Sequence, residues 1–290
     1  MLSVEKLDIV DICTPPQTHA PLALEALRRG CHVLLEKPMA LKTSECEEII
    51  NTSASNKVKL CVIHNQLFTP PFLKARKLEA KNIIGDFIGM RIFLSDPREE
   101  MIMRKNHWIH KLPGGLIGET GPHAVYMSLS FLKRVTGVEI YAKNFLEHPW
   151  APFDEFRIEL EGEKAMSSIT VSYASNRHEI LIDILGTEGI LHLDLSNMLL
   201  IHYGRKVSSR PLPFIRHLSK ISCQVMGGVA VNAFKLATGR LKLGHDIIIE
   251  RFIDSILNDT QPPVTGEEGK KVVEVMEMIV ARLQEKYKLN

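Results

Sequence analysis

Residues 7–38, LDIVDICTPPQTHAPLALEALRRGCHVLLEKP, contain two short apolar runs separated by a helical pattern. The first run ends at Pro15-Pro16 and the second before Pro38, and proline ends a strand because it cannot donate to the ladder. Alanine and leucine recur at helical spacing over residues 18–30, and the final glycine stands where a helix commonly ends. Continuously apolar strands joined by a helix indicate a parallel sheet that is buried on both faces.

The same alternation continues along the next part of the chain. Residues 43–55 have a helical pattern, and KLCVIHN at 59–65 is a third apolar run. Pro70-Pro71 then introduce another helix, because proline is tolerated in a first helical turn. Since parallel strands are joined by right-handed crossovers, we expect residues 1–68 to form half of a Rossmann-like domain.

From about residue 84 the pattern changes to strands that alternate apolar and polar residues. This alternation is typical of an antiparallel sheet with one face in water. One helix is expected at 115–133, and three follow the strands at about 214–239, 245–258 and 266–286. The fold class is therefore α/β: a partial Rossmann-like parallel sheet, N-terminally truncated, followed over residues 69–290 by an α+β domain with a large, mostly antiparallel sheet.

Composition excludes several classes of protein. In 290 residues, 45% hydrophobic and 24% charged residues predict a folded core, and a net charge of +2 argues against a nucleic-acid partner. Five cysteines without a Cys-x-x-Cys pair favour a reducing, cytoplasmic location over a disulfide framework. We expect no signal peptide and no membrane span, because the most apolar long stretch, 221–237, is too short and too polar.

Glu36-Lys37-Pro38 is the first candidate for chemistry, because it follows a parallel strand at its carboxyl end. Ligands of open α/β sheets bind beyond these ends. A lysine there can hold a hydroxyl or carbonyl oxygen, and burial can lower its pKa. The ordinary alternative is a surface lysine on a loop.

The second candidate is GGLIGETGPH at 114–123. On a helix, Glu119 and His123 share a face, and a carboxylate beside a histidine suits a general base that works near neutral pH. Gly121 would let a ligand or another backbone approach closely. The alternative is a helix-face ion pair without a function.

A metal site is a further possibility. His107-x-x-His110, followed by Glu119 and His123, could supply nitrogen and oxygen ligands for a hydrolase or lyase. The spacing matches no standard zinc pattern, so we expect no metal.

Taken together, these motifs resemble the glucose–fructose oxidoreductase, inositol dehydrogenase and MocA-type (Gfo/Idh/MocA) family. The resemblance covers nearly the whole chain. It comprises DIVDICTPPQTHAPLALEAL and HVLLEKPMAL, then the glycine-rich stretch around Glu119-x-Gly-x-His123, and an ending from His245-Asp246 through FIDSILND to PPVTGEEG.

The resemblance implies a hydride transfer between NAD or NADP and a sugar, polyol or related carbinol, in a homo-oligomer. Lys37 would contact the reacting oxygen, His123 would take the hydroxyl proton, and Glu119 would orient both groups and the substrate. The Lys37–Pro38 bond is often cis in this family. The residues that would line the cofactor are Thr14, Pro15, Pro16, His19, Glu36 and Lys37.

The chain departs from the family pattern in two respects. The family usually has Asp in place of Glu119, and a longer side chain moves the carboxylate. The usual phosphate-binding Gly-x-Gly-x-x-Gly turn is also missing, and relative to the family we expect about 60 residues, on the order of two βα units, to be absent from the start. We therefore expect Met1 to be an internal methionine of a longer protein or the start of a truncated gene. A non-enzymatic remnant that serves as a binding or assembly module is the alternative function.

Two surfaces follow from this arrangement. The strand Asp8 to Thr14 would be an open apolar edge, so we expect the chain to aggregate or to dimerise through this edge or through the second sheet. The helix at 214–239 carries basic residues among apolar ones. It could cover the sheet, or contact a partner or a membrane surface, and packing in the core or an oligomer is the interpretation we favour.

Overall fold

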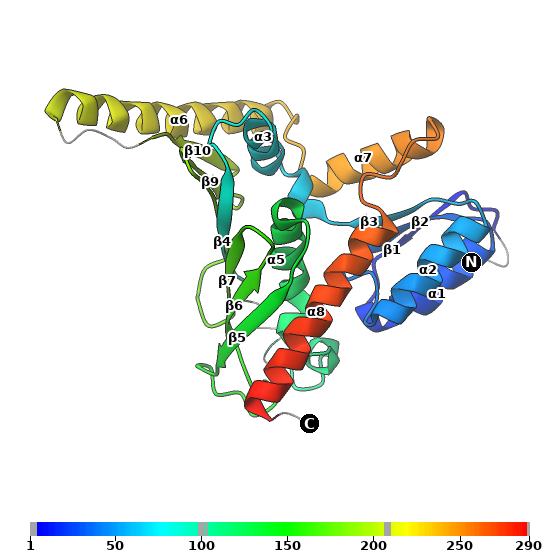
Figure 1. The fold of residues 1–290 in the computed structure, drawn as a ribbon. Coiled ribbons are helices and arrows are strands. Elements are labelled where there is room, and N and C mark those ends of the chain that lie inside the picture. Colours follow the sequence, from blue (N-terminus) through cyan, green and yellow to red (C-terminus); the bar gives the residue numbers. More distant parts are fainter. Residues whose placement is uncertain (1–4, 98–101, 103, 206–209, 289–290) are drawn as a thin grey trace.

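The computed structural model describes residues 5–97, 102, 104–205 and 210–288, and Figure 1 shows that they form two sheets with helices around them. The first sheet contains β1 (Ile9–Ile12), β2 (His32–Glu36) and β3 (Leu60–Ile63), all parallel and in that order. The connecting helices α1 (His19–Arg28) and α2 (Thr43–Ser55) pack against each other. The half sheet predicted from the two apolar runs is confirmed.

The second sheet has seven strands in the order β10-β9-β8-β4-β7-β6-β5. All neighbours are antiparallel except β4 and β7, which are parallel. Buried and accessible residues alternate along most of its strands, as expected for a sheet with one wet face. The bounds are β4 (Phe87–Ser95), β5 (Gly137–Lys143), β6 (Glu155–Glu161), β7 (Met166–Ser172), β8 (Glu179–Gly186), β9 (Ile190–Asp194) and β10 (Leu199–Tyr203).

Five further helices of the described residues complete the architecture. They are α3 (Pro70–Glu79), α5 (Ile117–Leu132), α6 (Pro211–Ala237), α7 (Gly244–Leu257) and α8 (Gly266–Tyr287). Helices α5 and α8 pack against each other and cover the second sheet, whereas α7 lies beside the first sheet (Figure 1). Helices α5, α6, α7 and α8 lie within three residues of their expected bounds, and α3 begins at Pro70 as expected.

Helix α8 joins two hydrophobic cores. Val273 packs with the first sheet, while Ile279 and Leu283 belong to the core under the second sheet. Gly269 explains the close approach at the start of this helix, because a Cβ there would lie 2.7 Å from Val62 Cγ2. The small residue thus lets α8 rest directly on β3 before it crosses to the second sheet.

Helix α6 does not pack as expected. It has no buried residue, and its contact with the body runs along β10, where Gln224 bonds to the main chain of His202 and Asn232 to that of Met198. The favoured interpretation of its apolar sequence is packing in the core or in an oligomer. Packing in the core of this chain is wrong, because no residue of α6 is buried, and packing in an oligomer stays a prediction. Neither α6 nor any other described helix is long and apolar enough to cross a membrane.

Candidate active site

Lys37 directly follows β2 and is joined to Pro38 by a cis peptide bond. Its side chain is only 9% exposed and extends to α5, where Nζ donates to Glu119 Oε1 at 2.9 Å and to the main-chain oxygen of Glu119 at 2.8 Å. A buried ammonium needs such partners, because a buried charge is otherwise costly. The lysine is thus not a surface residue of a loop, and it links the two sheets.

The ammonium group of Lys37 has three N–H donors, and two of them are used by Glu119. The third can be offered to an oxygen of a ligand beyond the carboxyl end of β2. Because the main chain of Glu119 holds one donor and its carboxylate a second, the direction of the third is restricted.

His123 lies one helical turn after Glu119 and is tied to Tyr126, since its Nδ1 lies 2.7 Å from Tyr126 Oη. The phenol also accepts a bond from Gln66 N at 3.1 Å and donates to Asn65 Oδ1 at 3.0 Å. Since its single proton is used for Asn65, Nδ1 of His123 is the donor in the neutral ring. This tautomer leaves Nε2 as the basic nitrogen, as a general base requires.

The hydrogen bonds of His123, Tyr126 and Asn65 form a network, which continues from Asn65 back to the end of β2. Asn65 Nδ2 lies 3.4 Å from His245 Nδ1, and His245 Nε2 lies 3.4 Å from Glu36 Oε1. All of these bonds can run in one direction, with each group donating to the next. The Glu36 carboxylate raises the pKa of His245 above its usual range. Both ends of the network therefore meet at the site, Glu36 beside Lys37 and His123 beside Glu119.

Burial keeps the middle of this network uncharged. Tyr126 is 2% exposed, and burial raises the pKa of its phenol well above the usual range. The ring of His64 stacks on Tyr126 with centroids 4.4 Å apart, and burial lowers its pKa to about 3. Tyr126 is therefore a neutral hydrogen-bonding group near pH 7, and His64 supplies apolar support.

The expected cofactor-lining residues fall into two groups. Thr14 and Pro15 are exposed beyond β1, and Glu36 is half-buried at the end of β2, so these residues are accessible to a ligand. Pro16 and His19 are buried. The ring nitrogens of His19 lie 2.7 Å from Pro38 O and 2.8 Å from Thr14 O, so this residue joins the two loops and does not present a nitrogen to a ligand.

A nicotinamide group fits this edge of the sheet, because the Lys37 ammonium and the accessible Thr14 and Pro15 lie at carboxyl ends of parallel strands. The described part of the chain has no glycine-rich turn of the Gly-x-Gly-x-x-Gly type. The residues present would therefore hold the nicotinamide end of a dinucleotide.

Two of the histidines proposed as metal ligands form hydrogen bonds within the chain. One is His123, whose Nδ1 lies beside Tyr126 Oη. His107 Nδ1 accepts a bond from Ile109 N at 3.3 Å. Within residues 5–97, 102, 104–205 and 210–288, no three His, Cys, Asp or Glu side chains come close enough to hold a metal ion. Gly121 also has a structural role, since a Cβ there would lie 2.9 Å from Met276 Cε. The glycine thus makes room for the Met276 side chain of α8.

Three residues of the site were not singled out from the sequence as site residues. Tyr126 is the most accessible to prediction, because it lies three residues after His123 and so shares its helix face. Asn65 follows the third strand at its carboxyl end, where a ligand-binding residue is expected. His245 comes from a helix about 180 residues further along, and only the tertiary fold brings it to Asn65.

A parallel half sheet with a buried lysine at its carboxyl edge, bonded to a helix of the second domain that also carries a histidine, is typical of a dinucleotide-dependent oxidoreductase. Comparison with known families agrees. Residues 1–64 match the model of an oxidoreductase family with an NAD-binding Rossmann fold, and residues 72–192 match its Gfo/Idh/MocA C-terminal domain. The chain therefore belongs to the Gfo/Idh/MocA family, and the resemblance seen in the sequence is confirmed.

Two named relatives match about half of the chain. An oxidoreductase named P35 of Formosa agariphila is 28% identical over 145 residues, which is 48% of this chain and 45% of that protein. A glycosyl hydrolase family 109 protein of Shewanella baltica is 28% identical over 140 residues, which is 45% of this chain and 30% of that protein. The chain thus spans less than half the length of these relatives.

Solved structures share the fold over nearly the whole chain. The WlbA dehydrogenase from Bordetella pertussis, in complex with NADH and UDP-GlcNAcA, superimposes with a TM-score of 0.77 at 20% identity, covering 99% of this chain and 80% of that one. An oxidoreductase from Agrobacterium radiobacter, in complex with NAD+, L-tartaric acid and magnesium, has a TM-score of 0.72 at 20% identity and covers 96% and 78%. At this identity the likeness concerns the fold.

Proposed function

We propose that the protein is an NAD(P)-dependent dehydrogenase that acts on a sugar, polyol or related carbinol. One observation carries the proposal: a buried lysine at the carboxyl edge of a parallel sheet is bonded to α5 one helical turn before a histidine whose Nε2 is the basic nitrogen. The family is described as NAD-binding, and two structures of the same fold hold NADH or NAD+. The alternative function, a non-enzymatic binding or assembly module, does not require this geometry.

In the proposed reaction His123 acts as the base. Its Nε2 accepts the proton of the substrate hydroxyl, while Nδ1–H stays bonded to Tyr126. Tyr126 is held in turn by Asn65 and Gln66, so its phenol fixes the orientation of the His123 imidazole. A positioned base of this kind accelerates proton transfer by about 10²–10⁴-fold.

Lys37 binds the same substrate oxygen with its third N–H donor. As the proton leaves, negative charge develops on this oxygen, and the ammonium stabilises it in a buried environment. Glu119 holds the ammonium in place and keeps it paired when no substrate is bound. Bound NAD or NADP would supply the hydride acceptor, and Thr14, Pro15 and Glu36 would line its nicotinamide end.

The proposed substrate class rests on the chemistry of the site and on its relatives. A base together with a cationic hydrogen-bond donor suits a hydroxyl on a carbon that also carries hydrogen. Two structures of the same fold hold UDP-GlcNAcA and L-tartaric acid, and both ligands carry carbinol groups. Sugars, sugar nucleotides and hydroxy acids are therefore the compounds to screen.

The test has two stages. NADH and NADPH are titrated into the protein while nicotinamide fluorescence is followed, both with residues 1–290 and with a chain extended upstream if the gene encodes one. Reduction of NAD+ and NADP+ is then measured with a panel of sugars, sugar nucleotides, polyols and hydroxy acids. We expect binding, and turnover that a His123→Asn substitution lowers by about 10²–10⁴-fold.

The controls separate the two functions. A Lys164→Gln variant changes an exposed lysine between β6 and β7 and should bind and react like the unchanged protein. Loss of turnover with unchanged NADH binding in His123→Asn supports the proposed base. Absence of both binding and turnover in every form of the chain favours the non-enzymatic module.

A further inference from the structure

The outward face of α6 carries exposed apolar side chains near both ends of the helix, with small residues between them. Leu212 is 80% exposed, Ile215 57%, Met226 71% and Val229 53%. At 100° per residue these side chains and the small residues between them form one stripe, opposite Gln224 and to one side of Asn232, the two residues that bond to β10 and the turn before it. The 27 residues of α6 make a helix about 40 Å long. A monomer rarely exposes an apolar surface of this extent without a partner.

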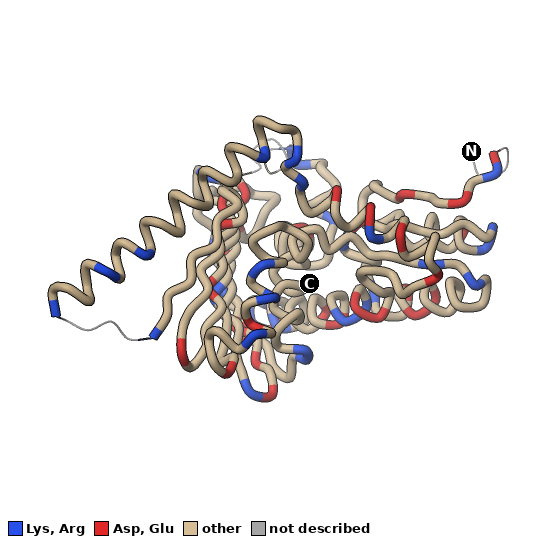
Figure 2. The backbone as a smooth tube through the Cα atoms, turned by 90° about the horizontal axis from the view of Figure 1, so that it is seen from above, with Lys and Arg blue, Asp and Glu red and all other residues tan. Residues whose placement is uncertain are grey.

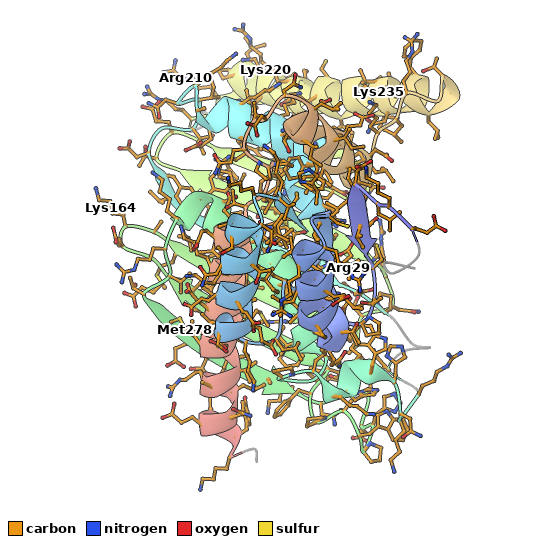
Figure 3. All side chains as sticks on the ribbon, turned by 90° about the vertical axis from the view of Figure 1, so that its right-hand side faces the viewer. Arg29, Lys164, Arg210, Lys220, Lys235 and Met278 are labelled. Atoms are coloured by element: carbon orange, nitrogen blue, oxygen red, sulfur yellow. The ribbon has the colours of Figure 1, made fainter. Side chains whose placement is uncertain are left out.

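The segment around α6 carries only positively charged side chains among its Lys, Arg, Asp and Glu positions. Residues 195–245 hold eight of the 36 Lys and Arg residues and none of the 34 Asp and Glu residues. Figure 2 shows α6 projecting from the body with basic positions and no acidic ones along it. In Figure 3, Arg210, Lys220 and Lys235 lie along α6, while Lys164 and Met278 lie well away from it.

The basic side chains flank the apolar stripe and do not neutralise it. Arg216 and Lys220 lie on one side of the stripe by helical spacing, and both are exposed. Neither residue forms an ion pair with any part of the chain that the structure describes. Lys235 lies on the side of α6 that faces the body, so it adds to the positive charge of the helix but does not edge the stripe. An apolar stripe edged by unpaired cations fits a partner that is apolar inside and anionic at its surface.

We propose that α6 binds the surface of an anionic lipid bilayer, lying in the plane of the membrane with its apolar stripe among the acyl chains. A second copy of α6 fits less well, because pairing these helices would bring their unpaired cations together without an acidic residue from the same segment. The net negative charge of the rest of the chain would direct the body away from the lipid and α6 toward it.

The attachment of α6 to the body suits this orientation. The hydrogen bonds of Gln224 and Asn232 hold one side of the helix against β10, so the opposite side stays available. The catalytic groups are on other elements, β2, η2 (Asn65–Phe68), α5 and α7. The membrane contact is therefore independent of the proposed dehydrogenase activity, and either proposal can fail without the other.

The experiment is co-sedimentation of the purified chain with vesicles of phosphatidylcholine alone or of phosphatidylcholine with phosphatidylserine. We expect binding to the anionic vesicles and its loss at high salt. Arg216→Gln with Lys220→Gln should weaken binding about thirtyfold, as expected for two basic residues near a charged surface. Lys81→Gln with Lys164→Gln removes the same charge elsewhere and should leave binding unchanged.

The apolar contact is tested with Met226→Glu, matched by Met278→Glu on α8, where the side chain is also exposed. We expect the first to abolish vesicle binding and the second to retain it, with the same circular dichroism for both. Failure of the unchanged protein to bind anionic vesicles would overturn the proposal. So would equal binding by both methionine variants, or a dimer that Met226→Glu dissociates while vesicles have no effect, since this would assign the stripe to a second copy.

Discussion

At the scale of single residues, Lys37 and Glu119 combine a structural and a proposed catalytic role, and substitutions can separate the two. Lys37→Met leaves the Glu119 carboxylate buried without its ammonium partner, so the free energy of unfolding should fall by about 3 kcal/mol. Adding Glu119→Gln removes the uncompensated charge and should restore most of this loss. Turnover should stay at least about 10²-fold reduced in both variants.

Urea denaturation and steady-state kinetics check this pair of variants. If Glu119→Gln failed to recover stability in the Lys37→Met background, the ion pair would not be the source of the loss. If it recovered turnover as well, Lys37 would have no role beyond neutralising Glu119.

Tyr126→Phe tests the hydrogen bond that orients His123. Without the phenol, Nδ1–H loses its acceptor and the tautomer with a basic Nε2 is no longer favoured, so kcat should fall by roughly 10–10²-fold. Tyr173→Phe is a matched control, because Tyr173 also donates from a buried phenol, to Leu116 O, but is not bonded to the base. A pH profile of kcat/KM that changes equally in both variants would contradict the proposed role.

His245 gives the site a dependence of stability on pH. Glu36 raises the folded-state pKa of His245, so the pair stabilises the protein below the unfolded pKa of about 6.5, and this contribution is lost as pH rises through the higher folded value. His245→Gln should therefore destabilise the protein more at about pH 5 than at about pH 8. Because the side chain is half exposed, the difference should not exceed about 1 kcal/mol.

Thermal or urea unfolding at the two pH values measures this difference. His217→Gln is the control, since His217 lies on α6 and forms no ion pair with the residues that the structure describes. A loss in His245→Gln that is equal at both pH values would show that Glu36 does not stabilise the charged imidazole.

At the scale of elements, α7 must approach η2 closely for the network to form. A Cβ at Gly244 would lie 2.0 Å from Asn65 O, so Gly244→Ala should push apart the two elements that carry His245 and Asn65. We expect a loss of about 1–3 kcal/mol in stability and a lower kcat. Gly227→Ala in α6 meets no atom within 4 Å and should be neutral or stabilise by up to about 1 kcal/mol. Unchanged turnover in Gly244→Ala would exclude a catalytic effect of the network.

The elements also show which parts of the fold the sequence could predict. Apolar runs ended by Pro15 and Pro38 are local signals, and they correctly predicted β1 and β2. Glu119 and His123 share a helix face, so their proximity followed from spacing alone. The bond from Lys37 to the main chain of Glu119 crosses two domains, and no local pattern contains it. Likewise, the apolar stripe of α6 has the same pattern whether a core, a partner or a membrane covers it.

At the scale of the whole molecule, β1 lies at the edge of the three-stranded sheet in the described structure, as the sequence predicted. Ile9 and Val10 are partly accessible there, so a strand of a second copy can reach this edge. Pairing of the two copies stays a prediction. Light scattering of the unchanged chain and of Val10→Lys tests it. We expect less self-association with the lysine, whereas a monomer in both cases would contradict the prediction.

The two cores should unfold together, because α8 belongs to both. Ile279→Ala removes a fully buried side chain from the second core and should cost about 3 kcal/mol, and Val273→Ala on the same helix should cost about 2 kcal/mol through the first core. Trp108 and Trp150 both pack against the second core, so tryptophan fluorescence reports on that part, whereas circular dichroism reports on the whole chain. Val273 belongs to the first core, whereas both tryptophans report on the second. If α8 couples the cores, Val273→Ala nevertheless shifts the urea transition equally in fluorescence and in circular dichroism. A shift in circular dichroism without one in fluorescence would mean that the cores unfold separately, and then a defect at the first sheet would leave His123 and Glu119 folded but without Lys37.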